Sequence, residues 1–181
     1  KGKLIALDHL MVSQSVTERA FPGVVKDGLD PFMTEGASNL VYAVPNLRSR
    51  VVIKDTGVRV GYWRSVSHAL NAFAFESFID ELAKAGNRDP LQFRLEMLAE
   101  QPRQRAVLEK VAAMAEWKRS RGANAALGIA SMECYGSYVA MTAEVQRRGK
   151  DVHCARIAVA VDPGIAVRPD HVIAQIESAV I

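Results

Sequence analysis

The chain has 181 residues, of which 49% are hydrophobic and 24% charged, and its formal net charge at pH 7 is +3. These values are near the average of globular proteins and exclude a mainly disordered or fibrous chain, and no apolar run approaches the roughly 20 residues of a membrane-spanning helix. The small positive charge indicates no nucleic-acid partner, and the basic residues that gather in one region are expected to form a solvated helix surface: Arg103, Arg105, Lys118, Arg119 and Arg121.

The cysteines and histidines predict neither a disulfide nor a protein-ligated metal. Cys134 and Cys154 are expected on the strands of a hairpin that turns near Gly149-Lys150, with Cys154 opposite Val145. Cys134 then lies about ten residues further along, or roughly 30 Å at ~3.3 Å per residue, which is too far for a disulfide. The histidines have no metal-ligand spacing: His9, His68, His153 and His171.

The first third of the chain predicts strands around a long loop. Residues Lys3 to Val16 are rich in β-branched and apolar types, which favours a strand. Residues 20–46 contain several Gly and Pro residues and predict an irregular loop, and a loop of this length is usually functional or packs on another part of the protein. Arg48 to Trp63 predicts two strands separated at Asp55–Gly57.

A block of three helices is expected over residues 67–122. Ser67 is the expected N-cap of the first helix, which Gly86-Asn87 ends. Its expected apolar stripe is Leu70, Phe73, Ala74, Phe78, Ile79 and Leu82, and its expected outward-facing residues are Asn71, Asp80, Glu81 and Lys84.

The next two helices carry clear start signals. Asp89 followed by Pro90 and Gln92 combines an N-cap, a proline at the first helical position and a capping box. Pro102 opens the third helix, and Gly122 is expected to close it.

The last third predicts a strand hairpin over residues 126–161, a turn at Asp162–Gly164, and a terminal helix over residues 169–181. That helix ends on apolar residues without a cap, which predicts that the chain is a segment of a longer protein and that the isolated fragment self-associates. The order of elements indicates an α+β fold, with mixed and antiparallel strands, three helices in a block, and a C-terminal helix.

Familiar catalytic motifs are absent from the sequence. It contains no P-loop and no spaced-glycine dinucleotide fingerprint, and Gly136-Ser137 lacks the Gly-x-Ser-x-Gly frame of a serine hydrolase. Glu76 and Asp80 have the i, i+4 spacing of a helical acid–base pair, but the same spacing is typical of the polar face of an amphipathic helix, which is the favoured interpretation.

Residues 61–68 combine an aromatic residue, an arginine and the start of a capped helix. Backbone N–H groups at a helix N-terminus beside Arg64 can hold an anion or an oxo group. The alternative is that Trp63 and Arg64 form a buried stacking pair that only packs.

The same region carries a family resemblance. Gly61 to Ala83, followed by Asp89 to Leu95, resembles the large subunit of the xanthine oxidase family of molybdenum hydroxylases, of the type represented by the beta chain of isoquinoline 1-oxidoreductase and by membrane-associated, molybdopterin-binding aldehyde dehydrogenases. Further matching segments follow in the family's order and extend the resemblance over essentially the whole chain: 39–47, 135–140, 160–164 and 174–177.

The resemblance implies that residues 1–181 are part of a molybdopterin-binding domain. It implies that Trp63, Arg64 and Ser65 approach the cofactor, that Gln175 binds its pterin, and that the cofactor is molybdopterin cytosine dinucleotide, held by the full-length parent and absent from the fragment. The family's catalytic glutamate motif has no counterpart here, so no catalytic residue and no protein ligand to the metal is expected within the chain. Departures from the family pattern put cofactor affinity in question: Ser67, Arg168 and Ser178.

For the parent protein, the resemblance implies oxidation of an N-heterocycle or an aldehyde with oxygen derived from water. The implied partners are an iron–sulfur small subunit and a cytochrome c electron acceptor, and the compartment stays open between periplasm, membrane surface and cytoplasm. The alternative is a non-catalytic binding or structural module of the same fold.

Overall fold

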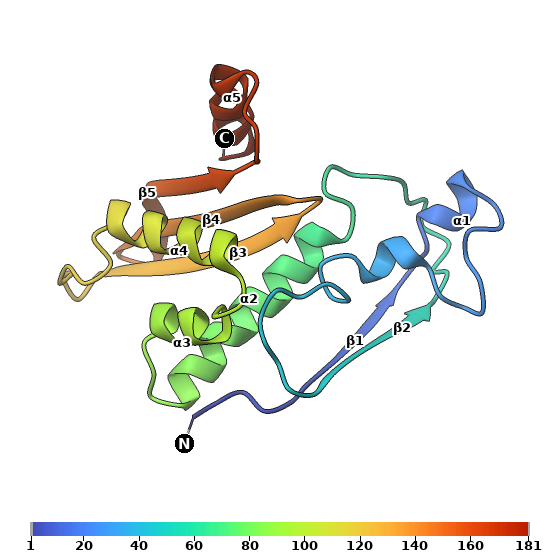
Figure 1. Ribbon diagram of the computed structural model, residues 1–181, viewed down its shortest axis with the longest axis horizontal. Coiled ribbons are helices and arrows are strands. Elements are labelled where there is room, and N and C mark those ends of the chain that lie inside the picture. Colours follow the sequence, from blue (N-terminus) through green and yellow to red (C-terminus); the bar gives the residue numbers. More distant parts are fainter. Residues whose placement is uncertain (1, 181) are drawn as a thin grey trace. The chain divides into compact units, whose positions relative to one another are not determined.

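The computed structural model describes residues 2–180 and divides into two compact units, Lys1–Arg88 (unit 1) and Asp89–Ile181 (unit 2). It contains helices together with parallel and antiparallel strands (Figure 1), so the predicted α+β class is confirmed. Within the described range, no helix combines the length and the apolar character that crossing a membrane requires.

Unit 1 is built on a parallel pair of strands, β1 (Leu7–Ser13) and β2 (Leu47–Ile53). Parallel strands need a long crossover between them, and the predicted irregular loop supplies it. Within that connection the structure has a short helix, α1 (Thr17–Ala20), and a 3₁₀ turn, η1 (Pro31–Thr34). The strand expected over residues 3–16 is thus confirmed in its central part.

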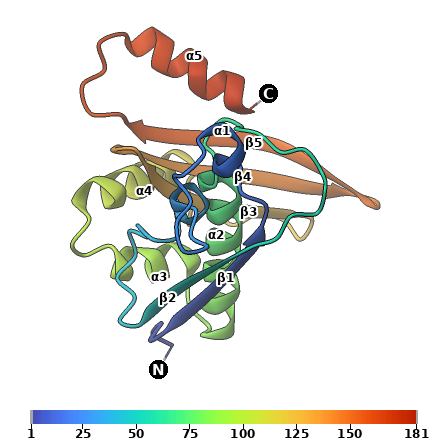
Figure 2. The ribbon, with the colours of Figure 1, turned by 90° about the vertical axis from the view of Figure 1, so that its right-hand side faces the viewer.

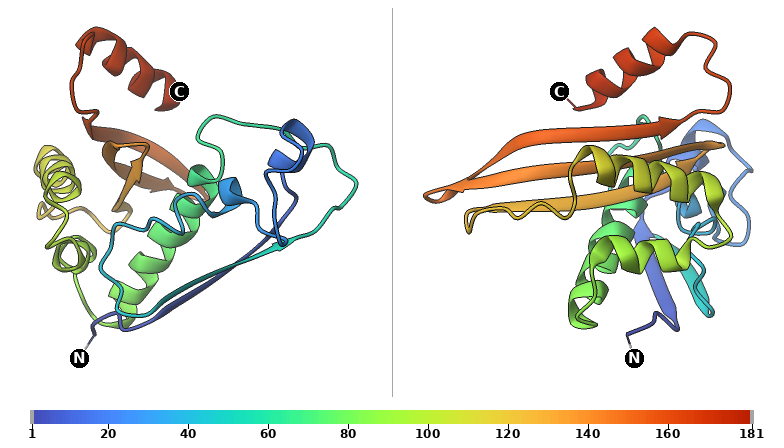
Figure 3. Two further views of the ribbon diagram at one scale, coloured as in Figure 1. Left: turned by 45° about the vertical axis from the view of Figure 1, so that its right-hand side comes forward. Right: turned by 60° about the vertical axis from the view of Figure 1, so that its left-hand side comes forward.

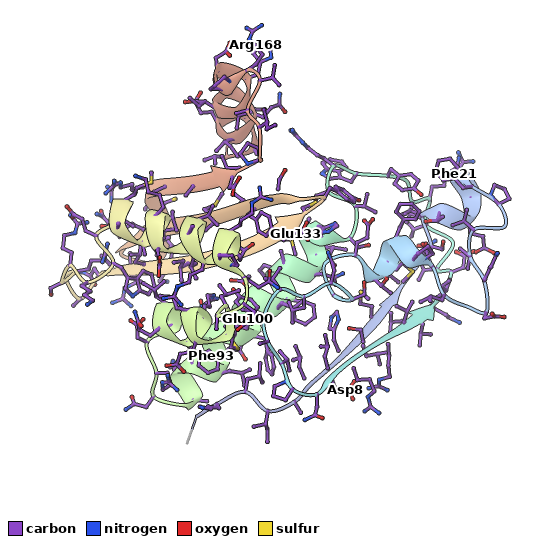
Figure 4. All side chains as sticks on the ribbon, viewed as in Figure 1. Asp8, Phe21, Phe93, Glu100, Glu133 and Arg168 are labelled. Atoms are coloured by element: carbon purple, nitrogen blue, oxygen red, sulfur yellow. The ribbon has the colours of Figure 1, made fainter. Side chains whose placement is uncertain are left out.

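A small apolar core joins the β1–β2 pair to helix α2 (His68–Ala85). Leu7 and Phe75 are buried in it together with Ala37 from the crossover loop. The opposite side of the strands carries Asp8, which Figure 4 shows on the side turned away from α2 and which pairs with Arg48 and Arg50.

Helix α2 buries Ile79 of the predicted apolar stripe, but most of its buried face differs from the predicted one. Leu70 and Phe73 are 70% and 77% exposed, whereas Asn71, predicted to face outward, is buried. Because apolar residues occur on several faces of this helix, apolar spacing alone does not determine which face packs. The buried polar side chains decide it: Asn71 donates to the Glu35 carbonyl at 2.7 Å, and Glu76 accepts the Tyr42 hydroxyl at 2.8 Å.

The predicted helix start at Ser67 is confirmed in position but not in its capping bond, and the second strand expected between residues 58 and 63 is wrong. Ser67 stands at the N-cap position, but its side chain makes no capping hydrogen bond. Residues 54–63 contain no described strand. The Asp55 side chain accepts the Gly57 N–H at 2.8 Å in a local turn, and the Gln14 side-chain amide donates to Asp55 at 3.0 Å and to the Val58 carbonyl at 2.8 Å.

Unit 2 begins with the two helices whose start signals were predicted, α3 (Pro90–Met97) and α4 (Pro102–Met114). The Asp89 side chain accepts the Gln92 N–H at 2.9 Å, which confirms it as the N-cap. The predicted end of α4 at Gly122 is wrong. The helix ends earlier because Glu116 turns into the left-handed region, with φ 50°, and the Trp117 N–H closes on the Ala112 carbonyl.

The predicted hairpin over residues 126–161 is a three-stranded antiparallel sheet in the order β3 (Ala125–Cys134), β4 (Ser137–Arg148) and β5 (Asp151–Asp162), as Figure 2 shows. The turn at Gly149-Lys150 and the pairing of Val145 with Cys154 are confirmed, and both cysteines are free thiols. The sequence did not predict the turn at Tyr135-Gly136 between β3 and β4, where both residues have positive φ, 51° and 80°.

Helix α4 packs on one face of this sheet and contacts all of its strands. The predicted terminal helix is present as α5 (Pro169–Val180), and Ile181 lies outside the described residues. Figure 3 shows α5 beyond strand β5, where an apolar groove between them is lined by Val159, Val161, Ile173 and Ile176. No described residue of α5 is buried, and self-association of the isolated chain stays a prediction.

Replacement of the N-cap Asp89 tests the start of unit 2. Asp89→Ala should lower the free energy of unfolding by about 1–2 kcal/mol, because it removes the cap and the acceptor for the Trp117 indole N–H, which lies 2.9 Å away. Asp89→Asn keeps a capping oxygen and should cost less than about half as much. Chemical denaturation of both variants measures the difference, and equal losses would contradict a capping role.

Candidate functional site

A strained turn precedes helix α2 and contains the residues that the sequence singled out. Ser65 and Val66 lie in the left-handed region, with φ of 72° and 47°. The turn is closed by the Val66 N–H on the Trp63 carbonyl at 3.0 Å and by the His68 N–H on the Ser65 carbonyl at 2.9 Å. The left-handed conformation costs a residue with a side chain roughly 1–2 kcal/mol, so two in succession need support from the surrounding structure.

The side chains of this turn are not packed away. Trp63 is 83% exposed, and Arg64 is exposed as well. A buried Trp63–Arg64 stacking pair, the alternative offered by the sequence, is therefore wrong. An exposed tryptophan beside an exposed guanidinium can instead meet a ligand that arrives from solvent.

A cavity of about 600 Å³ opens beside the turn. Its volume is within the usual range of small-molecule sites. Strand β1, the residues that follow it, the turn and the first turns of α2 all contribute to its wall, which is lined by His9, Met11, Ser13, Gln14, Trp63, Val66, Ser67, Leu70, Asn71 and Ala74, among others.

The start of α2 supplies hydrogen-bond donors to this cavity. Ala69 and Leu70 line it, and neither backbone N–H has a hydrogen-bond partner among residues 2–180. Unpaired N–H groups in the first turn of an 18-residue helix favour negatively charged or oxo-rich groups. The cavity therefore fits a ligand that combines an apolar surface with anionic or oxo oxygens.

His9 is a further polar group at the cavity, one that the sequence did not mark. Its ring packs on Phe75 with centroids 4.6 Å apart, and its Nδ1 is buried without a hydrogen-bond partner in the described chain. Burial lowers the pKa of His9, so its imidazole is neutral at pH 7. A neutral imidazole can both donate and accept a hydrogen bond.

Gln175, the other predicted cofactor residue, lies in unit 2 on α5 and is exposed. The structure therefore brings Trp63, Arg64 and Ser65 together in one turn and places Gln175 in the other unit. A surface shared by Arg64 and Gln175 stays a prediction.

The turn that leads toward α5 is held by an ion pair. Arg103, in the first turn of α4, donates to the Asp162 carboxylate at 2.7 and 2.8 Å, and its guanidinium lies 4.3 Å from the centre of the Tyr138 ring. The Gly164 N–H donates to the same carboxylate at 2.9 Å. The Arg103 hydrogen bonds, and next the Gly164 N–H, lower the pKa of Asp162 to about 2.

The departures from the family pattern cause no backbone strain here. Ser67 has φ −80° and ψ −12°, a conformation open to any residue. Ser178 lies within α5 and is exposed. Arg168, which directly precedes that helix, donates hydrogen bonds to Asp170 in its first turn.

The other candidate residues of the sequence form hydrogen bonds or ion pairs within the structure. Glu76 is buried and accepts the Tyr42 hydroxyl, as expected of a packing residue rather than an acid–base pair with Asp80. Over residues 2–180, no group of three or more His, Cys, Asp or Glu side chains is placed to hold a metal ion. Most of the clustered basic residues pair with carboxylates: Arg103, Arg105, Arg119 and Arg121.

Asp30 is a second residue that the sequence reasoning missed. Its side chain is completely buried and accepts the Phe32 N–H at the start of η1. The signal was present in the sequence, because Asp30-Pro31 repeats the N-cap and proline pattern of Asp89-Pro90.

Comparison with known proteins gives relatives that match most of the chain. It is 34% identical over 186 aligned positions to the beta chain of isoquinoline 1-oxidoreductase from Brevundimonas diminuta, an alignment that covers 99% of this chain and 24% of that protein. It is 31% identical over 182 positions to the membrane-bound aldehyde dehydrogenase [pyrroloquinoline-quinone] of Gluconacetobacter polyoxogenes, covering 87% of this chain and 23% of that protein.

A third relative is the B component of nicotinate dehydrogenase from Pseudomonas putida, 34% identical over 154 positions, which cover 73% of this chain and 13% of that protein. The chain thus spans about a quarter or less of the length of these curated relatives. No protein-family model matches the chain.

Substitution by glycine tests the strain in the turn. Ser65→Gly should raise the free energy of unfolding by about 0.5–1 kcal/mol, because glycine relieves the left-handed φ and loses part of that gain to its greater freedom in the unfolded chain. Ser67→Gly, at a right-handed residue two positions later, should lower it by about 0.5–1 kcal/mol. Thermal unfolding measures both, and changes of the same sign would contradict the assigned strain.

The depressed pKa of Asp162 predicts a pH dependence of stability. Its contribution is fully present above the unfolded-state pKa, about 3.9, and is lost as the pH falls through about 2. The melting temperature of Asp162→Asn should therefore lie below that of the unsubstituted chain at pH 5–7, and the gap should close toward pH 2. The control Asp151→Asn removes an exposed carboxylate at the β4–β5 turn and should leave the melting temperature nearly unchanged. A gap for Asp162→Asn that does not vary with pH would contradict the assigned ion pair.

Proposed function

Because the chain belongs to the family of molybdenum hydroxylase large subunits that includes the beta chain of isoquinoline 1-oxidoreductase, we propose that it forms part of the molybdopterin-binding surface of such an enzyme. The chain spans 24% of that relative's length. The activity, substrate and partners given below are accordingly proposals for the whole protein.

The observation that carries the proposal is the exposed Trp63–Ser65 turn at the edge of a cavity of about 600 Å³. The N–H groups of Ala69 and Leu70 and the Arg64 guanidinium offer donors and positive charge to phosphate or oxo oxygens. The indole of Trp63 offers a flat apolar surface to a heterocyclic ring. The residues present therefore fit a pterin cofactor that bears a phosphate and a metal–oxo group.

Trp63, Arg64, Ser65 and Gln175 are the residues proposed to hold the cofactor. When bound, the cofactor supplies the metal at which the substrate is oxidised with oxygen from water. Arg64 would neutralise negative charge on its phosphate or oxo groups, and the side-chain amide of Gln175 would both donate and accept hydrogen bonds at the pterin. No residue of the described chain is assigned as the general base.

The finer features of the parent enzyme are also proposed. The cofactor is assigned as molybdopterin cytosine dinucleotide, and the substrate as an N-heterocycle or an aldehyde, in keeping with relatives named for isoquinoline, aldehyde and nicotinate. Two relatives are named as the beta or the B component of their enzymes, which supports a multi-subunit assembly. An iron–sulfur protein and a cytochrome c acceptor are the proposed partners. Because one relative's name specifies pyrroloquinoline quinone, the cofactor has to be measured directly.

The test is the cofactor content of the full-length protein purified with its iron–sulfur partner. Molybdenum, pterin, cytidine nucleotide and pyrroloquinoline quinone are each measured per polypeptide. Arg64→Ala should weaken cofactor retention by at least about tenfold, the usual factor for a lost charge-assisted hydrogen bond, and Gln175→Ala by about three- to tenfold, the factor for an ordinary one. Both losses should appear before the melting temperature falls. Arg148→Ala, at the exposed β4–β5 turn, is the matched control and should leave cofactor content unchanged.

Two outcomes would overturn the proposal. Folded protein that holds no pterin removes its basis. Variants at Arg64 and Gln175 that change stability but neither metal content nor turnover would assign the chain to a structural module instead.

A further inference from the structure

Hydrogen bonds hold the chain on both sides of the strained turn before α2, and on the Tyr62 side they lead to a buried carboxylate. Ser65 and Val66 are held in the left-handed region. Tyr62 directly precedes the turn and α2 directly follows it. The contacts of these two flanks therefore determine whether the turn keeps its conformation.

Asp30 is the centre of a buried hydrogen-bond network in the β1–β2 crossover. Its side chain is 0% exposed. One oxygen accepts the Ser15 hydroxyl at 2.6 Å, and the other accepts the Thr17 hydroxyl at 2.8 Å and the Phe32 N–H at 2.9 Å. A buried carboxylate is tolerated only when its oxygens are satisfied in this way, so the segments that supply these donors are held together.

Tyr62 joins this network through Thr17. The Tyr62 hydroxyl donates to Thr17 Oγ1 at 3.2 Å, and its ring meets Phe21 and Phe32 edge-on, with centroids 5.9 and 6.0 Å apart. A threonine hydroxyl has one proton. Because Thr17 gives that proton to Asp30, its oxygen is left to accept from Tyr62, so Asp30 sets the direction of the whole Tyr62–Thr17–Asp30 chain.

The other flank of the turn is tied to the same crossover segment. Asn71, in the first turns of α2, donates its side-chain amide to the Glu35 carbonyl at 2.7 Å and to the Met33 carbonyl at 3.4 Å. The residues Asp30–Glu35 are here called the clamp segment. Hydrogen bonds link this segment to Tyr62 by way of Thr17, and to α2 by way of Asn71.

We propose that Asp30 is a positioning residue for the cofactor-binding turn Trp63–Ser65, acting through Thr17 and Tyr62. This assignment rests on the proposed function. Asp30 is not itself a ligand, because it is completely buried. It holds the clamp segment and Tyr62 in place, so that the turn presents Trp63 at the cavity, with Arg64 next to it in the chain, in the conformation that the cofactor binds, without reorganisation on binding.

The experiment compares two tyrosine variants that each lose one hydroxyl bonded to a buried partner. Tyr62→Phe removes the link to Thr17 and keeps the ring contacts. Tyr42→Phe, the matched control, removes the 2.8 Å bond to Glu76, which lies further along α2 than Asn71 and outside the Tyr62–Thr17–Asp30 chain. Asp30→Ala removes the centre of the network, and because it can fail to fold, Tyr62→Phe is the deciding variant.

The first arm measures how often the turn opens in protein without cofactor. Arg64-Ser65 is a trypsin site within the turn, so the rate of cleavage there reports how often the turn opens in the cofactor-free full-length protein. Tyr62→Phe should be cut roughly three- to tenfold faster at this bond, the factor expected from losing one ordinary hydrogen bond, and Tyr42→Phe should be cut at the unsubstituted rate.

The second arm measures the rate at which pterin is lost from the full-length holoprotein. Tyr62→Phe should lose pterin about three- to tenfold faster than the unsubstituted protein, and Tyr42→Phe should not, even where its melting temperature is lower. Unchanged cleavage at Arg64 would overturn the clamp. Faster cleavage with unchanged pterin loss would overturn its role toward the cofactor. Unsubstituted protein that holds no pterin overturns the proposed function, and the trypsin arm then still decides whether the clamp exists.

Discussion

The turn before α2 keeps two adjacent residues with side chains, Ser65 and Val66, in the left-handed region of backbone space. That conformation is unfavourable for each of them, so it persists only where the chain on both sides is held. Tyr62 is held through Thr17 and the buried carboxylate of Asp30, and α2 is held through Asn71 on the same crossover segment. The resulting turn exposes Trp63 at the edge of a cavity instead of burying it in the core.

In unit 2, a partly exposed ion pair holds the turn through which the chain leaves the sheet. Arg103 links the first turn of α4 to Asp162 at the end of β5, and its guanidinium covers the Tyr138 ring at the start of β4. Both charged side chains remain partly in water, at 42% and 34% exposure, so solvent screens the pair and its main effect is geometric. It fixes the Asp162–Gly164 turn from which the chain continues to α5 and Gln175.

The differences between expectation and structure have specific physical causes. The helices that start at Pro90 and Pro102 were predictable because their start signals lie within a few residues of sequence. The packing face of α2 was not, because a helix with apolar residues on several faces can bury more than one of them, and buried hydrogen bonds to Asn71 and Glu76 made the choice. The turn at Tyr135-Gly136 was missed because Tyr135 carries no glycine-like signal, although it adopts a φ of 51°.

The sequence by itself determined the α+β class, the starts of α3 and α4, and the pairing of Val145 with Cys154, and it indicated the segment from Trp63 to Ser65 as a candidate binding turn. Only the tertiary structure decided that Ser65 and Val66 are left-handed, that Trp63 is exposed, and that Asp30 is buried and linked to Tyr62 through Thr17. The physical reason is that caps and strand register depend on neighbours in sequence or on regular pairing. The strained turn is instead stabilised by hydrogen bonds between Thr17, Asp30 and Tyr62, residues brought together only when the crossover between two parallel strands closes.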